Sequence, residues 1–434
     1  MLEDDIYKTS TQYRLWSFTE DSLRSIRANT NNAASQRVRA AVQRARDARE
    51  RQSGENTPNP TDGEAGTPSP IPMAEIECLT PDEEYELVRY YCEKAMELGD
   101  EYKPALSTSV RATAIQYLRR FYLTNSPMTY HPKSIMPCAL FLATKTDNFY
   151  MSLHSFAEHI PNSSTEGIIA PEFLLTQGLR FTFDVRHPFR GLEGGMMELN
   201  AIAQGEGIPG PHHPEQTPAS LQKLFESLPS SNTTSSSSSI DLTARLRRAH
   251  HDTREILKHA AQLTDVYFLY TPSQIWLAAF LIADKPLAET YLDTKLGVLP
   301  PSSLAGSAGS SRNPSDHPAA VLSALRTKLT SVLQSCVDML NAYRTSAGAS
   351  DPKKLKRIAK KLYHCQNPEK LDLVALNKLQ KSGGSYVPFA QDSARSASAS
   401  TPGGVEDEVE RAAKKRKVEA EDPKSNVFGA EVVR

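Results

Sequence analysis

Apolar residues recur through most of this chain at the spacing of amphipathic helices. One segment carries them at steps of mostly three and four: Val110, Ala114, Tyr117, Leu118 and Phe121. Such a stripe lies on one face of a helix and needs a partner surface to cover it. Residues 135–143 are instead apolar on every face, which is typical of a helix in the middle of a bundle. The pattern therefore predicts a predominantly helical protein.

Short polar signals mark where two of these helices begin. Thr80, Pro81 and Glu83 combine an N-cap hydroxyl, a proline at the first helical position and an acid three residues on, which is a capping box. We expect a helix to run from there toward Gly99. Residues 271–274 repeat the signal, so a second helix should begin at the proline within them.

The apolar central segment has a near copy further along the chain. PKSIMPCALFLATK, residues 132–145, is repeated as PSQIWLAAFLIADK, residues 272–285. A proline opens both copies, a lysine closes both, and an aromatic-rich segment comes just before each. Self-similarity of this kind predicts two all-α domains of one design, each built round a buried central helix.

Polar, flexible composition separates these helical stretches. Four segments rich in Ser, Pro, Gly, Thr or Asn are too poor in apolar residues to offset the entropy of ordering: 53–72, 204–239, 300–318 and 382–404. We expect disordered linkers or insertions there, and a helix at 351–365 near the end of the chain.

Composition narrows the class of protein. Lysine and arginine number 50 and aspartate and glutamate 51 among 434 residues, so no global positive field draws the chain to nucleic acid or anionic lipid. The five cysteines form no C-x-x-C pair, which disfavours a disulfide framework or a structural zinc site. No apolar run is long enough to cross a bilayer, and we expect a soluble intracellular protein that works with protein partners.

Four strings resemble the cyclin family and, within it, cyclin H. They are STQYRLWSFT at 10–19, YLRRFYLTNSPMTYHPKSIM at 117–136, FLATKTDNF at 141–149 and LTDVYFLYTPSQI at 263–275. The resemblance implies an all-α fold of tandem cyclin boxes, two five-helix bundles, with N- and C-terminal helices and disordered insertions. The domains expected are an N-terminal helical segment 1–52, a linker 53–72, a first box 73–186, a second box 187–344 with disordered insertions at 204–239 and 300–318, a C-terminal helix 345–381 and a tail 382–434.

The resemblance also implies two kinase-binding residues, Lys145 and Glu172. The signature lysine of the family pairs with an acid on the fifth helix, and Glu172 occupies the matching position before LRF. Without the resemblance, Lys145 is a cation that caps a helix end and Glu172 an acid favoured in a first helical turn. Phe141 and Leu175 either add apolar surface to this site or belong to the core, and the core is the favoured interpretation.

Three residues depart from the family pattern. Asn148 stands where many cyclins have a second acid, Pro137 lies inside the central helix, and Gly178 interrupts the fifth. Pro137 removes a backbone donor and should kink its helix unless it falls in the first turns.

The N-terminal segment contains Trp16 and Phe18 ahead of a helix expected to start near Thr19. Such a segment has no core of its own, so its apolar residues must dock on a box, on the kinase or on both. In cyclin H-like proteins the terminal helices pack together against the first box. This implies that residues 10–26 lie near the helix at 351–365.

Two basic tracts remain. Residues 37–51 carry six arginines, diluted by two acids, and a solvated helical extension is favoured over a nucleic-acid arm. Lys414, Lys415, Arg416 and Lys417 form a compact cationic run that predicts a nuclear import signal and hence a nuclear protein, the alternative being a solvated charge cluster.

The function implied is activation of a cyclin-dependent kinase catalytic subunit, together with a RING-finger assembly factor and the TFIIH core. Alternatives are a cyclin C-like subunit of the Mediator kinase and a TFIIB-like cyclin-fold transcription factor. We expect no enzyme activity, no cofactor, no metal and no direct contact with nucleic acid or membrane. The histidine pairs at 212–213 and 250–251 lack the spacing of metal ligands on one helical face.

Overall fold

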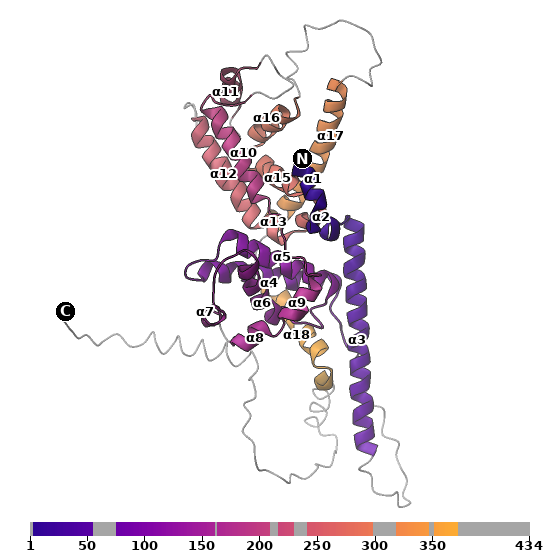
Figure 1. Ribbon diagram of the computed structural model, residues 1–434. Coiled ribbons are helices and arrows are strands. Elements are labelled where there is room, and N and C mark those ends of the chain that lie inside the picture. Colours follow the sequence, from indigo (N-terminus) through magenta and orange to yellow (C-terminus); the bar gives the residue numbers. More distant parts are fainter. Residues whose placement is uncertain are drawn as a thin grey trace, which may run out of the picture. The chain divides into compact units, whose positions relative to one another are not determined.

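The computed structural model describes residues 3–54, 75–160, 163–208, 216–229, 241–297, 318–346 and 351–371 (Figure 1). In these ranges every regular element is a helix, which confirms the all-α class. None of the described helices is long and apolar enough to span a membrane.

The chain begins with two short helices and one long one. They are α1 (Glu3–Thr9), α2 (Thr11–Trp16) and the 35-residue α3 (Glu20–Gly54). Ser10 caps α2, because its hydroxyl accepts a hydrogen bond from the backbone N–H of Tyr13. Helix α3, which begins at Glu20, is the helix expected to start near Thr19.

Six helices form the first bundle: α4 (Pro81–Glu101), α5 (Thr108–Thr124), α6 (Pro132–Thr146), α7 (Leu153–Glu158), α8 (Thr165–Ile169) and α9 (Glu172–Gly178). Helix α6 lies in the middle, where it packs on α4, α5, α8 and α9. Its Ala139 and Leu140 are completely buried, which confirms the central helix. The capping box also forms, since Thr80 and Glu83 bond reciprocally through side chain and backbone.

Eight helices form the second bundle: α10 (Phe189–Ala203), α11 (Pro218–Glu226), α12 (Leu242–Lys258), α13 (Ala260–Leu263), α14 (Val266–Leu269), α15 (Pro272–Ala283), α16 (Lys285–Leu296) and α17 (Pro318–Ser346). Helix α15 is the counterpart of α6 and packs on α10, α12, α16 and α17. The capping box of Thr271 and Gln274 opens it as predicted. The chain continues to α18 (Pro352–Gln366) and a 3₁₀ turn, η3 (Pro368–Lys370).

The two central helices end differently, although a lysine closes both repeated strings. Lys145 lies in the last turn of α6, but Lys285 is the first residue of α16. Asp284 causes the difference, because it leaves the helical conformation (φ −150°, ψ 92°) and its carboxylate accepts from the N–H of Leu287. The same carboxylate receives two hydrogen bonds from the buried Arg245.

Part of the predicted insertion at 204–239 is structured, so that prediction is wrong for residues 216–229. Thr217 and Ser220 form a capping box at the start of α11, and Leu221 and Phe225 are buried in the core of the second bundle. The average composition of 204–239 did not indicate this short amphipathic helix. Two apolar residues four positions apart are enough to attach it to the core. Residues 230–239, 382–404 and most of 53–72 and 300–318 lie outside the described residues.

Each departure from the family pattern has a local structural setting. Helix α6 continues through Pro137, its sixth residue. Asn148 follows the end of that helix with φ 55°, a left-handed conformation that asparagine tolerates better than most residues. Gly178 ends α9 against Phe121, where a Cβ would lie 2.5 Å from a ring carbon. A side chain there would push the helix off the core.

Candidate partner-binding site

Lys145 and Glu172 form an ion pair between α6 and α9, although 27 residues separate them in sequence. Lys145 lies where the free carbonyls of α6 favour a cation, and Glu172 opens α9, where free N–H groups favour an acid. Their side chains are 41% and 23% exposed. The pair is thus held in place by two helix ends and remains accessible to a partner.

The residues expected beside this pair belong to the core. The ammonium group of Lys145 lies 5.0 Å from the ring centroid of Phe141, but Phe141 is only 7% exposed. Leu175 is 0% exposed and packs in the core of the first bundle. Neither side chain offers apolar surface to a partner, and the core interpretation of both agrees with their burial.

Two apolar residues that sequence reasoning missed are exposed near the pair. Phe173 directly follows Glu172 and is 68% exposed, and Ile169 at the end of α8 is 42% exposed. Helical periodicity could have predicted that Phe173 is exposed. It lies two positions from the buried Leu175 and therefore on the opposite side of α9. Exposed apolar residues beside a charged pair are typical of a protein-binding surface.

The N-terminal signature residues dock on the segment that joins the two bundles. Gln12 is 1% exposed, and its Oε1 accepts hydrogen bonds from Arg120 Nη2 (3.2 Å) and from the N–H of Arg186 (2.7 Å). Arg120 also donates to the carbonyls of Thr182 and Asp184. Burial lowers the pKa of Arg120 to about 10, so it remains charged at neutral pH. Gln12 is therefore an internal hydrogen-bonding group that ties the N-terminal segment to Arg120 and Arg186.

Trp16 and Phe18 extend this contact to the second bundle. The Trp16 Nε1–H donates to Thr182 Oγ1 (2.9 Å), and the guanidinium of Arg120 lies 5.2 Å from the indole ring. The N–H of Phe18 donates to the carbonyl of Phe268 (2.8 Å), and the two rings meet edge to face. Both candidate docking residues are thus engaged within this chain.

The expected contact between residues 10–26 and the C-terminal helix is not formed. Ala34, Val38 and Val42 share an apolar cluster with Ile358 and Leu362 of α18 instead. The reason is length, because α3 rises ~1.5 Å per residue and places residue 38 about 18 Å beyond residue 26. One straight helix therefore reaches two separate docking sites.

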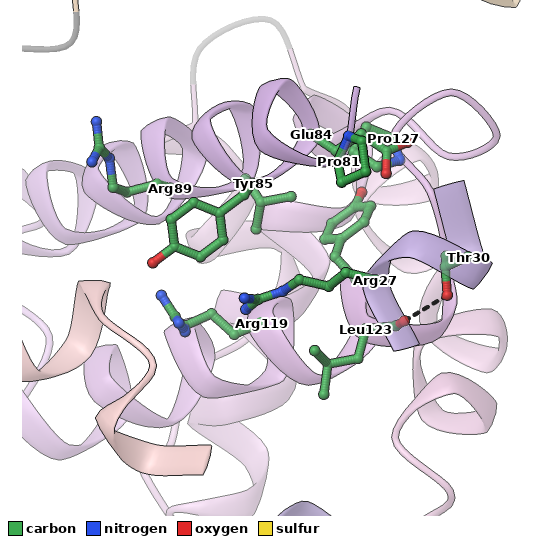
Figure 2. A pocket seen from close by; sticks show the side chains of 11 residues that line it. Arg27, Thr30, Pro81, Glu84, Tyr85, Arg89, Arg119, Leu123 and Pro127 are labelled. Atoms are coloured by element: carbon green, nitrogen blue, oxygen red, sulfur yellow. Dashed lines mark hydrogen bonds between the residues drawn. The ribbon is translucent and has the colours of Figure 1, made fainter. Parts of the chain in front are cut away.

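Arg27, Arg119 and Asp265 tie the long helix to both bundles. Asp265 precedes α14 and accepts two hydrogen bonds of 2.7 Å from Arg27 and one from Arg119. Burial acts to raise the pKa of Asp265, but the bonds from Arg27 and the charge of Arg119 hold it below its usual value. Figure 2 shows the Arg27 and Arg119 side chains beside the ring of Tyr85, whose hydroxyl donates to the carbonyl of Leu263.

A second polar network also crosses between the bundles. Gln116 Nε2 donates to Gln262 Oε1, and Gln262 Nε2 donates to the hydroxyl of Tyr267. His187 lies 3.0 Å from both the Tyr267 hydroxyl and Thr113 Oγ1. Burial lowers the pKa of His187 to about 3, so the imidazole is neutral at physiological pH.

The described ranges do not bring together the side chains of a metal site. No group of three His, Cys, Asp or Glu side chains there could hold a metal ion. His250 pairs with Glu193 and His251 is exposed, whereas residues 212–213 lie outside the described part. The predicted import signal, Lys414, Lys415, Arg416 and Lys417, also lies outside it.

Comparisons with known proteins agree with this architecture. The model of the cyclin C-terminal domain matches residues 187–341. The chain is 32% identical over 295 residues to cyclin CCL1 of Saccharomyces cerevisiae, covering 68% of this chain and 62% of that protein. It is 35% identical over 133 residues to cyclin-H of Xenopus laevis, covering 29% of this chain and 41% of that protein. The matches thus span less than two thirds of each relative.

A solved structure is similar over a larger share of the chain. It is the structure of the CAK complex of Chaetomium thermophilum bound to ATP-gamma-S. One of its chains aligns with a TM-score of 0.58 and 29% identity, covering 90% of this chain and 100% of that chain.

Proposed function

This chain belongs to the cyclin family, and we propose that it is a cyclin H-type regulatory subunit that binds and activates a cyclin-dependent kinase. The Lys145–Glu172 pair carries the proposal, because it is the accessible polar feature at which the family resemblance and the geometry coincide. The chain itself performs no chemistry in this role.

Activation of this kind is allosteric. Phosphoryl transfer requires a lysine on a kinase strand to pair with a glutamate on the αC helix, and an isolated cyclin-dependent kinase holds that helix turned away. A rigid surface that binds only the inward position of αC shifts the kinase equilibrium by its difference in affinity for the two states. The regulatory subunit is thus a ligand that selects the active conformation.

Residues around the pair suit such a surface. Lys145 and Glu172 keep hydrogen-bonding capacity beyond their mutual bond, since an ammonium has three donors and a carboxylate several acceptor positions. They would bond backbone groups near the αC helix, while Phe173 and Ile169 supply exposed apolar area. The tightly packed core under α6 and α9 makes the surface rigid, which limits the entropy lost on binding.

The wider assembly is part of the same proposal. We infer a RING-finger assembly factor and the TFIIH core as further partners, transcription by RNA polymerase II and the cell cycle as the processes served, and the nucleus as the location. The similarity to a chain of the CAK complex supports this assignment.

Reconstitution tests the proposal directly. The full chain, co-expressed with candidate cyclin-dependent kinase subunits, should copurify with one of them and raise its activity toward a peptide of the RNA polymerase II tail by several orders of magnitude. The isolated chain should show no transferase activity. Failure to bind or activate any such kinase would overturn the proposal.

A further inference from the structure

Positive charge is concentrated on two helices that the proposed kinase-binding site does not use. Residues 31–54 and 351–371 together hold thirteen lysines and arginines against four acids. This is an excess of nine positive charges in a chain whose net charge is −1, so the remaining residues are acidic overall. Net charge alone conceals this separation.

The fold brings the two basic segments together. Val38 and Val42 of α3 share the apolar cluster of Ile358 and Leu362 of α18. The Arg49 guanidinium donates to the carbonyl of Glu369 directly after α18 (2.9 Å). Segments about 300 residues apart in sequence therefore form one local structure.

The basic residues of α18 divide into two sets. Lys361 pairs with Glu83, and Lys354 pairs with Glu86, so both bind the helix to α4. The others are exposed on the face opposite Ile358 and Leu362: Lys353, Lys356, Arg357 and Lys360. Their spacing of three and four aligns them along the outer side of the helix.

Helix α3 presents a matching outer row. Arg37 and Arg44 are exposed and seven residues apart, which places them on one side of the helix, and Arg39 is exposed on the other flank of the buried stripe. In the described ranges no carboxylate pairs with Arg37, Arg39, Lys353, Lys356 or Lys360. We call Arg37, Arg44, Lys353, Lys356, Arg357 and Lys360 the terminal basic face.

The composition of this face discriminates between classes of partner. Protein interfaces place apolar or aromatic anchors at their centre and exclude charge from it. From residue 31 onward, the described part of α3 exposes no large apolar side chain, and α18 exposes only Tyr363. Repeated charge without anchors suits a phosphodiester backbone, whose interfaces are polar and strongly basic.

We propose that the terminal basic face binds the phosphate backbone of nucleic acid without reading its sequence. Such contacts release counterions, so the affinity should fall steeply with salt. The face would hold the kinase assembly near nucleic acid while the Lys145–Glu172 surface stays free for the kinase.

Fluorescence anisotropy of the full chain with a 30-bp duplex DNA and with a single-stranded RNA of equal length tests this. The variant R37Q/R44Q/K356Q/K360Q should bind either nucleic acid at least tenfold more weakly at 0.1 M salt. Its salt slope, d log K/d log[salt], should be smaller in magnitude by about 3 to 4. Separate R37Q/R44Q and K356Q/K360Q variants should each show part of the loss, and unchanged thermal unfolding would show that folding is intact.

Two controls distinguish other sources of binding. R190Q/K223Q/R247Q/R248Q removes four exposed charges from the second bundle and should leave affinity and slope within twofold of the unmodified chain. Neutralising Lys414, Lys415, Arg416 and Lys417 should also leave most of the binding. The proposal is overturned if the unmodified chain binds neither nucleic acid at 50 mM salt, if either control loses as much as the face variant, or if only a polyglutamate peptide binds.

Discussion

Arg27 on α3 donates two hydrogen bonds of 2.7 Å to the carboxylate of Asp265, which lies 238 residues further along the chain. Arg119 of the first bundle donates to the same carboxylate and is itself buried. One acid from the second bundle therefore connects the N-terminal helix and both bundles. This makes the position of α3 part of the fold rather than an appended extension.

Asp265→Asn should lower the free energy of unfolding by about 3 to 5 kcal/mol, because the buried Arg119 then lacks its counter-charge. Arg27→Ala should cost about 1.5 to 3 kcal/mol, the value of hydrogen bonds to a charged group. Urea unfolding measures both. Arg24→Ala is the control, since its pair with Asp21 is exposed and should contribute under 1 kcal/mol. Equal effects at Arg24 and Arg27 would contradict the account.

Lys145→Glu or Glu172→Lys should weaken kinase binding about ten- to a hundredfold without unfolding the protein, because each loses hydrogen bonds to charged groups worth about 1.5 to 3 kcal/mol. Surface plasmon resonance with the kinase, alongside thermal unfolding, provides the measurement. Lys285→Glu is a matched control. Lys285 is the corresponding residue of the second repeat, and its ion pair with Glu289 is exposed to solvent. Normal binding by both site variants would reject the assignment.

Helix α11 should be essential to the second bundle. Phe225→Ala removes a ring that is 1% exposed and should cost about 3 to 5 kcal/mol of stability, whereas Phe173→Ala removes an exposed ring and should cost under about 0.5 kcal/mol. Deleting 218–226 should abolish the cooperative unfolding of this bundle. Deleting 231–237, a serine- and threonine-rich stretch, should shift the melting temperature little, and the reverse order of effects would refute the role of α11.

The two docking sites on α3 should behave independently. Val38→Ala and Ile358→Ala lie in one apolar cluster, so a double-mutant cycle should give a coupling energy above about 0.5 kcal/mol. Trp16→Ala and Ile358→Ala lie in different clusters and should add within about 0.5 kcal/mol. Chemical denaturation of the three single and two double variants decides this. Strong coupling between Trp16 and Ile358 would restore the simpler picture of one terminal contact.

Acid should destabilise the protein through His187. Its folded-state pKa of about 3 lies below the unfolded value of about 6.5, so only the unfolded state gains a proton between these limits. The stabilisation is therefore complete above pH 6.5 and is lost as the pH falls, by up to about 1.4 kcal/mol per pH unit. His187→Gln should flatten this dependence between pH 4 and 6.5 in urea titrations. If the free energy of unfolding of this variant depended on pH as steeply as before, groups other than His187 would be the cause.

Sequence patterns alone determined several helices and where they start, because these features depend on neighbouring residues. The capping boxes at Thr80 and Thr271 and the apolar run of α6 are local signals with local physical causes. The repeat predicted two similar bundles for the same reason, since each buried central helix requires others around it. The Lys145–Glu172 pair came from the family resemblance rather than from spacing.

Tertiary structure decided which residues meet and which are exposed. Residue spacing does not predict that Asp265 accepts hydrogen bonds from Arg27, or that Gln12 accepts one from Arg120. These contacts join segments far apart in sequence. Composition averaged over 204–239 concealed α11, whose stability depends on the core that Leu221 and Phe225 enter. The net charge of the whole chain likewise gave no indication of the terminal basic face, because acidic residues elsewhere cancel its charge. Charge and apolar area act through their arrangement in space, and only folding supplies that arrangement.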